Sequence, residues 1–202
     1  MKRHGSIQLQ LVTILLVSIV ALTTGCHHGA RPDVSGDPVA QYDYGQSRKP
    51  LTAVEQDIRT ATPEELEEIE DRMLAIFESP NATYAGREFA CRMLRRMGSK
   101  DCVSVLADYL YDDELSDMAR FALQAMPYSK VDKELRRALK KLEGEQQIGV
   151  ISTLAARGDE EAVPQIADLA DTNNEALREA CILALERIGG PRAERALDEI
   201  GR

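Results

Sequence analysis

The chain has 202 residues, and its 34 acidic residues outnumber its 25 basic ones, which gives a formal net charge of −9 at pH 7. This acidic balance argues against a nucleic-acid-binding protein, because such proteins need a basic stripe to meet the phosphates. All three histidines lie before residue 30, at His4, His27 and His28. The remaining sequence therefore lacks the histidine that Ser-His-Asp and Cys-His systems and most zinc sites require. We expect no catalytic residue, no cofactor and no metal.

The first 25 residues have the pattern of a signal peptide. Lys2 and Arg3 precede an uncharged, mostly apolar run over residues 9–22. At roughly 14 residues, this run is short for a membrane span and typical of a cleaved signal. The segment Thr23-Thr24-Gly25-Cys26 follows and resembles the lipobox of bacterial lipoproteins, although that motif usually has Leu where Thr23 stands.

The lipobox resemblance implies that residues 1–25 are removed and that Cys26 becomes a lipidated N-terminus, anchored in a membrane of the bacterial cell envelope. Two or more acyl chains on one cysteine hold a protein to a bilayer far more firmly than one chain. Asp after this cysteine marks inner-membrane retention in some Gram-negative bacteria, so His27 favours the outer membrane, facing the periplasm. A secretory signal cut nearby and an uncleaved anchor remain as alternatives.

Residues 26–60 are interpreted as a flexible tether. Gly, Pro, Asp, Ser, Gln and Tyr dominate up to Leu51, and no apolar periodicity is visible. A disordered chain of this composition would have an r.m.s. reach of roughly 30 Å. Residues 51–60 could add a short helical turn that packs on the domain.

From residue 61 onward, the same apolar spacing recurs about every 30 residues, which is within the range of helical repeats. The positions that align are Ala90, Met93, Leu94, Met97 and Gly98; Ala119, Ala122, Leu123 and Met126; Val150, Thr153, Leu154 and Gly158; Cys181, Ala184, Leu185, Ile188 and Gly189. Apolar residues at i, i+3, i+4 and i+7 give each helix one buried stripe. A single hairpin cannot bury its stripe alone, so neighbouring copies are expected to stack. An irregular helical bundle is the alternative.

Local signals mark the ends of the helices. Thr62-Pro63-Glu64-Glu65 is a capping box with proline at the first helical position. Gly98, Gly158 and Gly189 follow helical segments, where a left-handed cap is expected, and Asn81 is placed to cap the next helix. No segment alternates apolar and polar residues with Val, Ile and Tyr enrichment, so we predict no strand.

The stretch at 159–190 resembles the bacterial HEAT-repeat pattern known as PBS-lyase HEAT-like. The matching residues are Ala162, Val163, Pro164, Ile166, Asp171, Leu177, Arg178 and the A-L-x-x-I-G run from Ala184 to Gly189. The resemblance implies an all-α fold, a short right-handed α-solenoid of about four HEAT-like hairpins over residues 61–202. It also implies a ladder of Asp–Arg hydrogen bonds at Asp171, Arg178 and Arg87, interrupted where Ser116 and Gln147 replace the arginine.

Arg92, Arg95 and Arg96 form a basic cluster on the second helix of the first expected hairpin, with Arg87 one to two turns earlier. Second helices line the concave face of HEAT stacks, so the resemblance places this cluster where an acidic protein partner could dock. The alternative is a solvated helix face that balances the acidic residues of 64–71.

Cys91, Cys102 and Cys181 each fall at an apolar repeat position and are interpreted as small buried hydrophobic residues. Only the pair Cys91 and Cys102 is near enough in sequence to consider as a disulfide, and the helix end between them is expected to keep them apart.

The predicted function is a membrane-tethered, non-catalytic scaffold or adaptor of the cell envelope that binds an unidentified protein partner. One alternative is an accessory subunit or lyase-like enzyme, because some HEAT-like proteins act on bilin chromophores. The other is a purely structural envelope protein.

Overall fold

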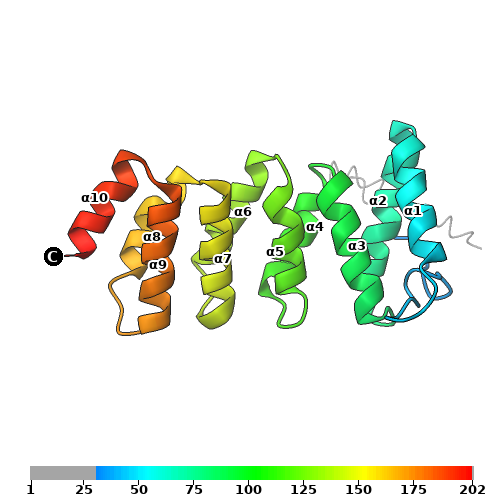
Figure 1. The fold of residues 1–202 in the computed structure, drawn as a ribbon, viewed down its shortest axis with the longest axis horizontal. Coiled ribbons are helices and arrows are strands. Elements are labelled where there is room, and N and C mark those ends of the chain that lie inside the picture. The colour runs from blue at the N-terminus through cyan, green and yellow to red at the C-terminus, as the bar shows by residue number, and fades with distance from the viewer. Residues whose placement is uncertain (1–30, 202) are drawn as a thin grey trace, which may run out of the picture.

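The computed structural model describes residues 31–201, a part of the chain that is all-α and contains no strand. The predicted signal peptide and Cys26 lie outside the described residues. The helices stand side by side in a row (Figure 1). They are α1 (Lys49–Thr60), α2 (Pro63–Glu78), α3 (Tyr84–Met97), α4 (Cys102–Asp108), α5 (Ser116–Ala125), α6 (Ser129–Leu139), α7 (Gly144–Arg157), α8 (Val163–Leu169), α9 (Glu175–Ile188) and α10 (Gly190–Ile200), with the 3₁₀ helices η1 (Tyr109–Tyr111) and η2 (Glu160–Ala162).

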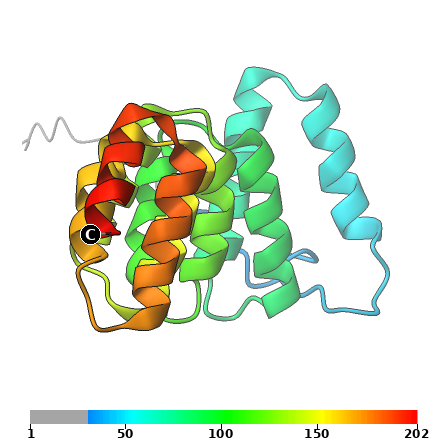
Figure 2. The same ribbon diagram turned by 60° about the vertical axis from the view of Figure 1, so that its left-hand side comes forward.

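Four helical hairpins make up the row: α2/α3, α4/α5, α6/α7 and α8/α9. The second helices form one layer, in which α3 packs on α5, α5 on α7 and α7 on α9. The first helices α2, α4, α6 and α8 form the layer behind them, as Figures 1 and 2 show. Helix α10 packs on both α8 and α9. The predicted HEAT-like α-solenoid of about four hairpins is therefore confirmed.

The core lies between the two layers and is continuous along the stack. The residues that set the repeat spacing are buried at equivalent places in successive second helices, as the predicted stripe requires. They include Ala90, Leu94, Ala119, Leu123, Val150, Leu154, Cys181 and Leu185. Each stripe is covered partly by its own first helix and partly by the next hairpin, so burial of one copy depends on its neighbours.

The N-terminal segment corrects the tether prediction. Residues 31–60 pack on the first hairpin, whereas their composition had indicated a flexible chain. Val39 is 0% exposed, and Val34, Ala40 and Tyr42 are also buried. Helix α1 adds Leu51, which is 0% exposed, and Val54 to the same core. The buried residues of 34–42 have no helical or strand period, so only their tertiary contacts reveal them. The tether remains a prediction for residues 26–30, which the structure does not describe.

A glycine allows the segment at residues 37–42, here called the strap, to lie against the start of α3. A Cβ on Gly86 would lie 2.5 Å from the carbonyl oxygen of Val39 and 2.9 Å from that of Ala40. The backbone N–H of Thr83 donates to the Ala40 carbonyl at 2.9 Å, and the Thr83 hydroxyl donates to the carbonyl of Tyr42. The close approach therefore lets these backbone carbonyls accept hydrogen bonds. A larger side chain at position 86 would push the strap away from α3 and break those bonds.

The predicted helix ends are confirmed in part. Thr62 and Glu65 form the capping box, with the Thr62 N–H donating to Glu65 Oε2 at 2.7 Å. Gly158 adopts the left-handed conformation with φ of 67°. Gly98 does not, since its φ is −56°. Its added Cβ would lie 2.7 Å from the Cys102 sulfur, so close packing explains this glycine. Thr83, and not Asn81, caps α3.

The predicted Asp–Arg ladder is wrong. Arg178 donates to the carbonyl of Ile200 at 3.2 Å, and Arg87 donates to the carbonyl of Ser79 at 2.7 and 3.1 Å. Within residues 31–201, the Asp171 carboxylate takes part in no hydrogen bond or ion pair. The two arginines therefore cap the ends of neighbouring helices, where carbonyl groups lack helical partners.

Candidate partner-binding surface

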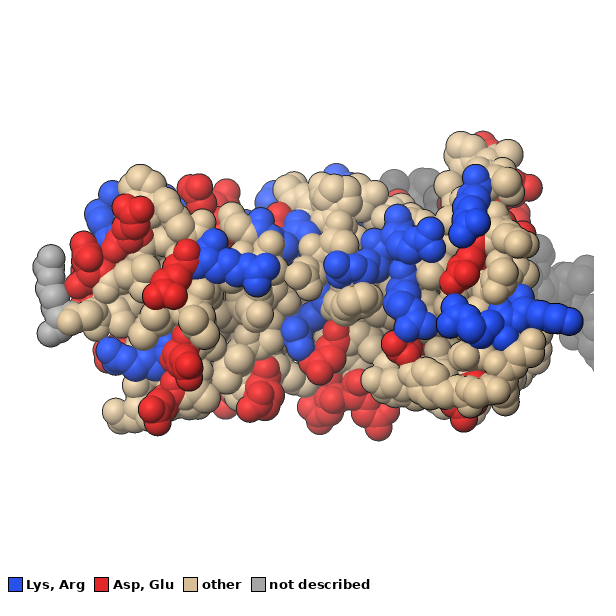
Figure 3. All heavy atoms as spheres, viewed as in Figure 1, with Lys and Arg blue, Asp and Glu red and all other residues tan. Residues whose placement is uncertain are grey.

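The outward sides of α3, α5, α7 and α9 form one continuous surface, which we call the second-helix face. Figure 3 views the molecule from this side. The inner sides of these helices are used for stacking, so only the outward residues are available to a partner. They include Arg92, Arg95, Arg96, Phe121, Ala125, Ser152 and Leu183.

The three predicted partner-binding arginines lie on α3, but their surroundings differ. Arg92 pairs with Glu88 one turn earlier, with Nη1 2.6 Å from Oε1. The guanidinium of Arg95 crosses to α5, where it lies 4.3 Å from the centre of the Phe121 ring and donates to the Phe121 carbonyl. Arg96 is exposed and makes no hydrogen bond or ion pair with any described residue. Arg96 is therefore the most available of the three cations.

Phe121 was not selected from the sequence. Phe121 is 44% exposed although it sits in the middle of α5. The buried residues of that helix include Met118, Ala119, Ala122 and Leu123, so Phe121 falls outside the apolar stripe. An aromatic residue outside the apolar stripe is the feature of the sequence that could have identified this exposed position. An exposed aromatic ring beside arginines is typical of the residues that dominate binding energy in protein interfaces.

Charges on the second-helix face are segregated along the helix axes. The first turns of α5, α7 and α9 carry Asp117, Glu145 and Glu175. The last turns of α3 and α9 carry Arg95, Arg96 and Arg187. Figure 3 shows acidic side chains along the lower edge of the face and basic side chains mainly above them. This arrangement complements the helix dipoles and also gives the face a basic band within an acidic protein.

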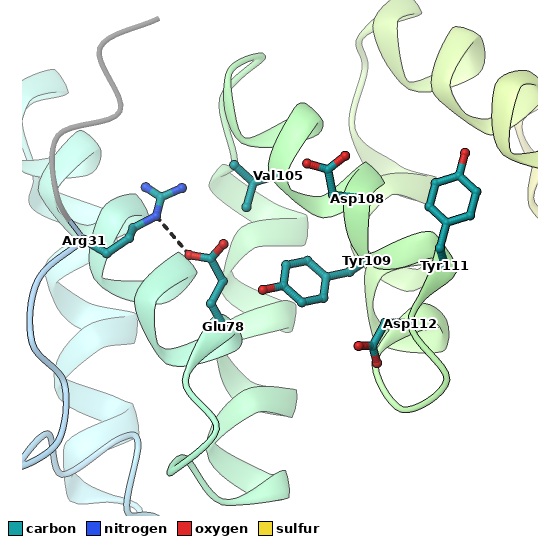
Figure 4. Close-up of a pocket in the computed structure, with 7 residues that line it drawn as sticks. All are labelled: Arg31, Glu78, Val105, Asp108, Tyr109, Tyr111 and Asp112. Atoms are coloured by element: carbon teal, nitrogen blue, oxygen red, sulfur yellow. Dashed lines mark hydrogen bonds and ion pairs between the residues drawn. The ribbon is translucent and has the colours of Figure 1, made fainter.

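A cavity of about 490 Å³ lies on the opposite side, between α2, α4 and η1 (Figure 4). Arg31 enters it, with Nε 3.1 Å from Glu78 Oε2 and Nη1 2.5 Å from Asp71 Oδ1. Burial and the nearby Glu78 raise the pKa of Tyr109, so this phenol stays protonated near neutral pH. Of the acidic groups here, Glu78 holds the N-terminal segment through Arg31, and Asp112 accepts from the N–H groups of Glu114 and Leu115.

Cys91, Cys102 and Cys181 are buried and unbridged, which confirms their interpretation as small hydrophobic residues. Burial raises the pKa of Cys91 and Cys102 to about 12 and that of Cys181 to about 11. The Cys91 thiol donates to the carbonyl of Met118 at 2.8 Å. Because thiolates are the reactive form, these cysteines should be inert in the folded protein.

Residues 31–201 contain no group of three or more His, Cys, Asp or Glu side chains arranged to hold a metal ion. No helix in this range combines the length and hydropathy of a transmembrane span. Cys26, the predicted lipidation site, lies outside it.

The profile of the family described as HEAT repeats matches residues 133–201, which hold α7 to α10 and most of α6. No curated protein matches the chain. HEAT repeats generally mediate protein–protein interaction, and a solenoid of this kind is usually non-catalytic. The match supports a HEAT-repeat domain in this chain.

Proposed function

We propose that this chain is a non-catalytic scaffold or adaptor of the bacterial cell envelope, which binds a protein partner on its second-helix face. A lipid on Cys26 would anchor it in the outer membrane, facing the periplasm. The repeat fold supports the scaffold role, because stacked hairpins create an extended surface on which a protein can bind.

The contact between Arg95 and Phe121 is the observation that favours the second-helix face as the binding surface. The two residues come from successive hairpins and meet on the surface, where Phe121 remains 44% exposed. An aromatic ring held by its neighbour loses little side-chain entropy when a partner covers it. Arg96 adds a cation beside it, so the site suits an acidic partner with an apolar contact residue.

The tether rests on sequence signals alone, namely the apolar run at 9–22 and the segment that ends at Cys26. Its test is direct. Mass spectrometry of the membrane-extracted protein should show an acylated N-terminus at Cys26, and Cys26→Ser should release the protein into the soluble fraction. A soluble wild-type protein, or membrane attachment that survives the substitution, would refute the tether.

The binding face can be tested by photo-crosslinking in intact cells. A benzophenone amino acid placed at Phe121 should capture a discrete partner. The matched control is the same substitution at Tyr111, an aromatic residue of similar exposure, 40%, on the opposite side. Crosslinks from position 121 alone would support the proposal. The same products from both positions, or none from position 121, would contradict it.

A further inference from the structure

The chain enters the described fold at a fixed point on the first-helix face, by which we mean the outward sides of α2, α4, α6 and α8. Arg31 pairs there with Asp71 and Glu78 of α2 and lies in the same cavity as Val105 and Asp108 of α4 (Figure 4). Its side chain is only 21% exposed.

The strap fixes the following residues as firmly. Arg72 of α2 holds Asp37 through two hydrogen bonds, from Nε to Oδ2 at 2.6 Å and from Nη2 to Oδ1 at 3.0 Å. The buried side chains of Val39 and Tyr42 continue this attachment toward the start of α3. The entry point therefore cannot slide along the stack without breaking these contacts.

The distance from Cys26 to Arg31 is short. Five residues of fully extended chain span at most about 18 Å. This is well below the roughly 30 Å reach of a free tether that extends to residue 60. A lipid at Cys26 would keep the surface around Arg31 within that distance of the bilayer.

We propose that the first-helix face of the second hairpin is turned toward the membrane and that the second-helix face is turned away from it. The inference rests on the proposed lipid anchor. It assigns the two sides of the solenoid different roles, since the side with Phe121 and Arg96 then points into the space where a soluble or membrane-distal partner can reach it.

Charge indicates that the anchor, and not adsorption, would hold this orientation. The surface around Arg31 carries Asp71, Glu78, Asp108 and Asp112, and Arg31 is already paired with the first two. Such a surface gains nothing from an anionic headgroup layer, and beyond about 8 Å its charges are screened at physiological salt. The surface around Arg31 should therefore be held near the membrane by the acyl chains, and any attraction to anionic lipids would come from the exposed basic residues of α6.

The test uses the full chain, extracted from the membrane with its lipid and reconstituted into vesicles of phosphatidylethanolamine and phosphatidylglycerol. A donor dye is attached to one introduced cysteine, and energy transfer is measured to an acceptor on the lipid headgroups. Ser104→Cys places the dye on the outward side of α4, and Ala125→Cys places it on the outward side of α5. Both positions belong to the same hairpin, so a stack standing on its end would place them at similar heights.

The buried native cysteines make this labelling specific, and wild-type protein serves as the control that takes up no dye. The dye at 104 should lie nearer the headgroups than the dye at 125 by roughly 20 Å, about two layers of helices. Vesicle flotation shows in parallel whether the protein is attached to the bilayer. If the protein floats with the vesicles but the two dyes lie at equal distances, or the dye at 125 is closer, the proposed orientation is wrong and the anchor is not. If the protein does not float, or carries no lipid, the proposed anchor is wrong as well.

Discussion

Arg157 at the end of α7 holds Asp132 of α6, with Nη2 3.2 Å from Oδ2, and the same guanidinium reaches into the preceding hairpin. It donates to the carbonyls of Leu123, Gln124 and Met126, at 3.2, 3.0 and 2.8 Å. These carbonyls lie at the end of α5, where the helical hydrogen bonds run out, and the Leu123 carbonyl also accepts from the N–H of Met126. The side chain of Arg157 thus caps the C-terminal end of α5 and links two successive hairpins.

Replacing this arginine should destabilise the whole stack. We expect Arg157→Ala to lower the free energy of unfolding by about 3 kcal/mol, because Asp132 loses its cation and the carbonyls of Gln124 and Met126 lose this donor. Urea unfolding provides the measurement. The control is Arg137→Ala, whose exposed ion pair with Glu134 should contribute less than about 1 kcal/mol. Equal losses of unfolding free energy in the two variants would show that the contact of Arg157 between the two hairpins contributes little to stability.

The strap offers a local test of packing. Gly86→Ala should displace it at a cost of roughly 1–3 kcal/mol, because the new methyl group meets two backbone carbonyls. Limited proteolysis should then cut within residues 31–48 while the hairpins stay intact. Gly36→Ala is the control, since a Cβ there has no atom within 4 Å and should leave the cleavage pattern unchanged. A strap that resists protease in both variants would contradict this packing.

Attachment of the strap should weaken in acid. Burial alone would raise the pKa of Asp37, but the hydrogen bonds from Arg72 and from the N–H of Val39 outweigh it and hold that pKa below its usual 3.8. A depressed pKa means that the stabilisation is complete above about 3.8 and is lost as the pH falls through the folded-state value.

Hydrogen-exchange protection of the Val39 and Ala40 amides, corrected for intrinsic rates, should therefore fall in this acidic range. Asp37→Asn should reduce the protection at pH 5 and remove this part of the pH dependence. If the wild-type profile stays flat down to pH 2, Asp37 does not hold the strap.

The cationic part of the partner site can be tested through association rates. Arg96→Glu should slow binding of the protein captured at position 121 several-fold at low salt, because rim charges steer the encounter. The free energy of unfolding of the Arg96→Glu variant should barely change, since Arg96 pairs with no described residue. Arg137→Glu, an exposed change on α6, is the control for net charge. Equal slowing by both variants would indicate a general charge effect and no specific docking.

The hairpins could be predicted because each buried stripe repeats, so four weak signals support one another. The packing of the strap could not be predicted, because Val39 and Tyr42 follow no period and are buried by helices from elsewhere in the chain. The role of Arg157 was hidden for a similar reason, since its acceptors are backbone carbonyls of another hairpin. Of the candidate site, the arginines were visible as a cluster, and Phe121 was visible only as an apolar residue outside its stripe.

The most direct measurement is the dissociation constant of the partner captured at position 121, determined by calorimetry for the wild type, Phe121→Ala and Tyr111→Ala. A binding site centred on the second-helix face predicts a loss of about 2 kcal/mol for Phe121→Ala, or roughly 30-fold in affinity. Tyr111→Ala should stay within about twofold of the wild type. Unchanged affinity in Phe121→Ala, with the protein folded, would contradict the account.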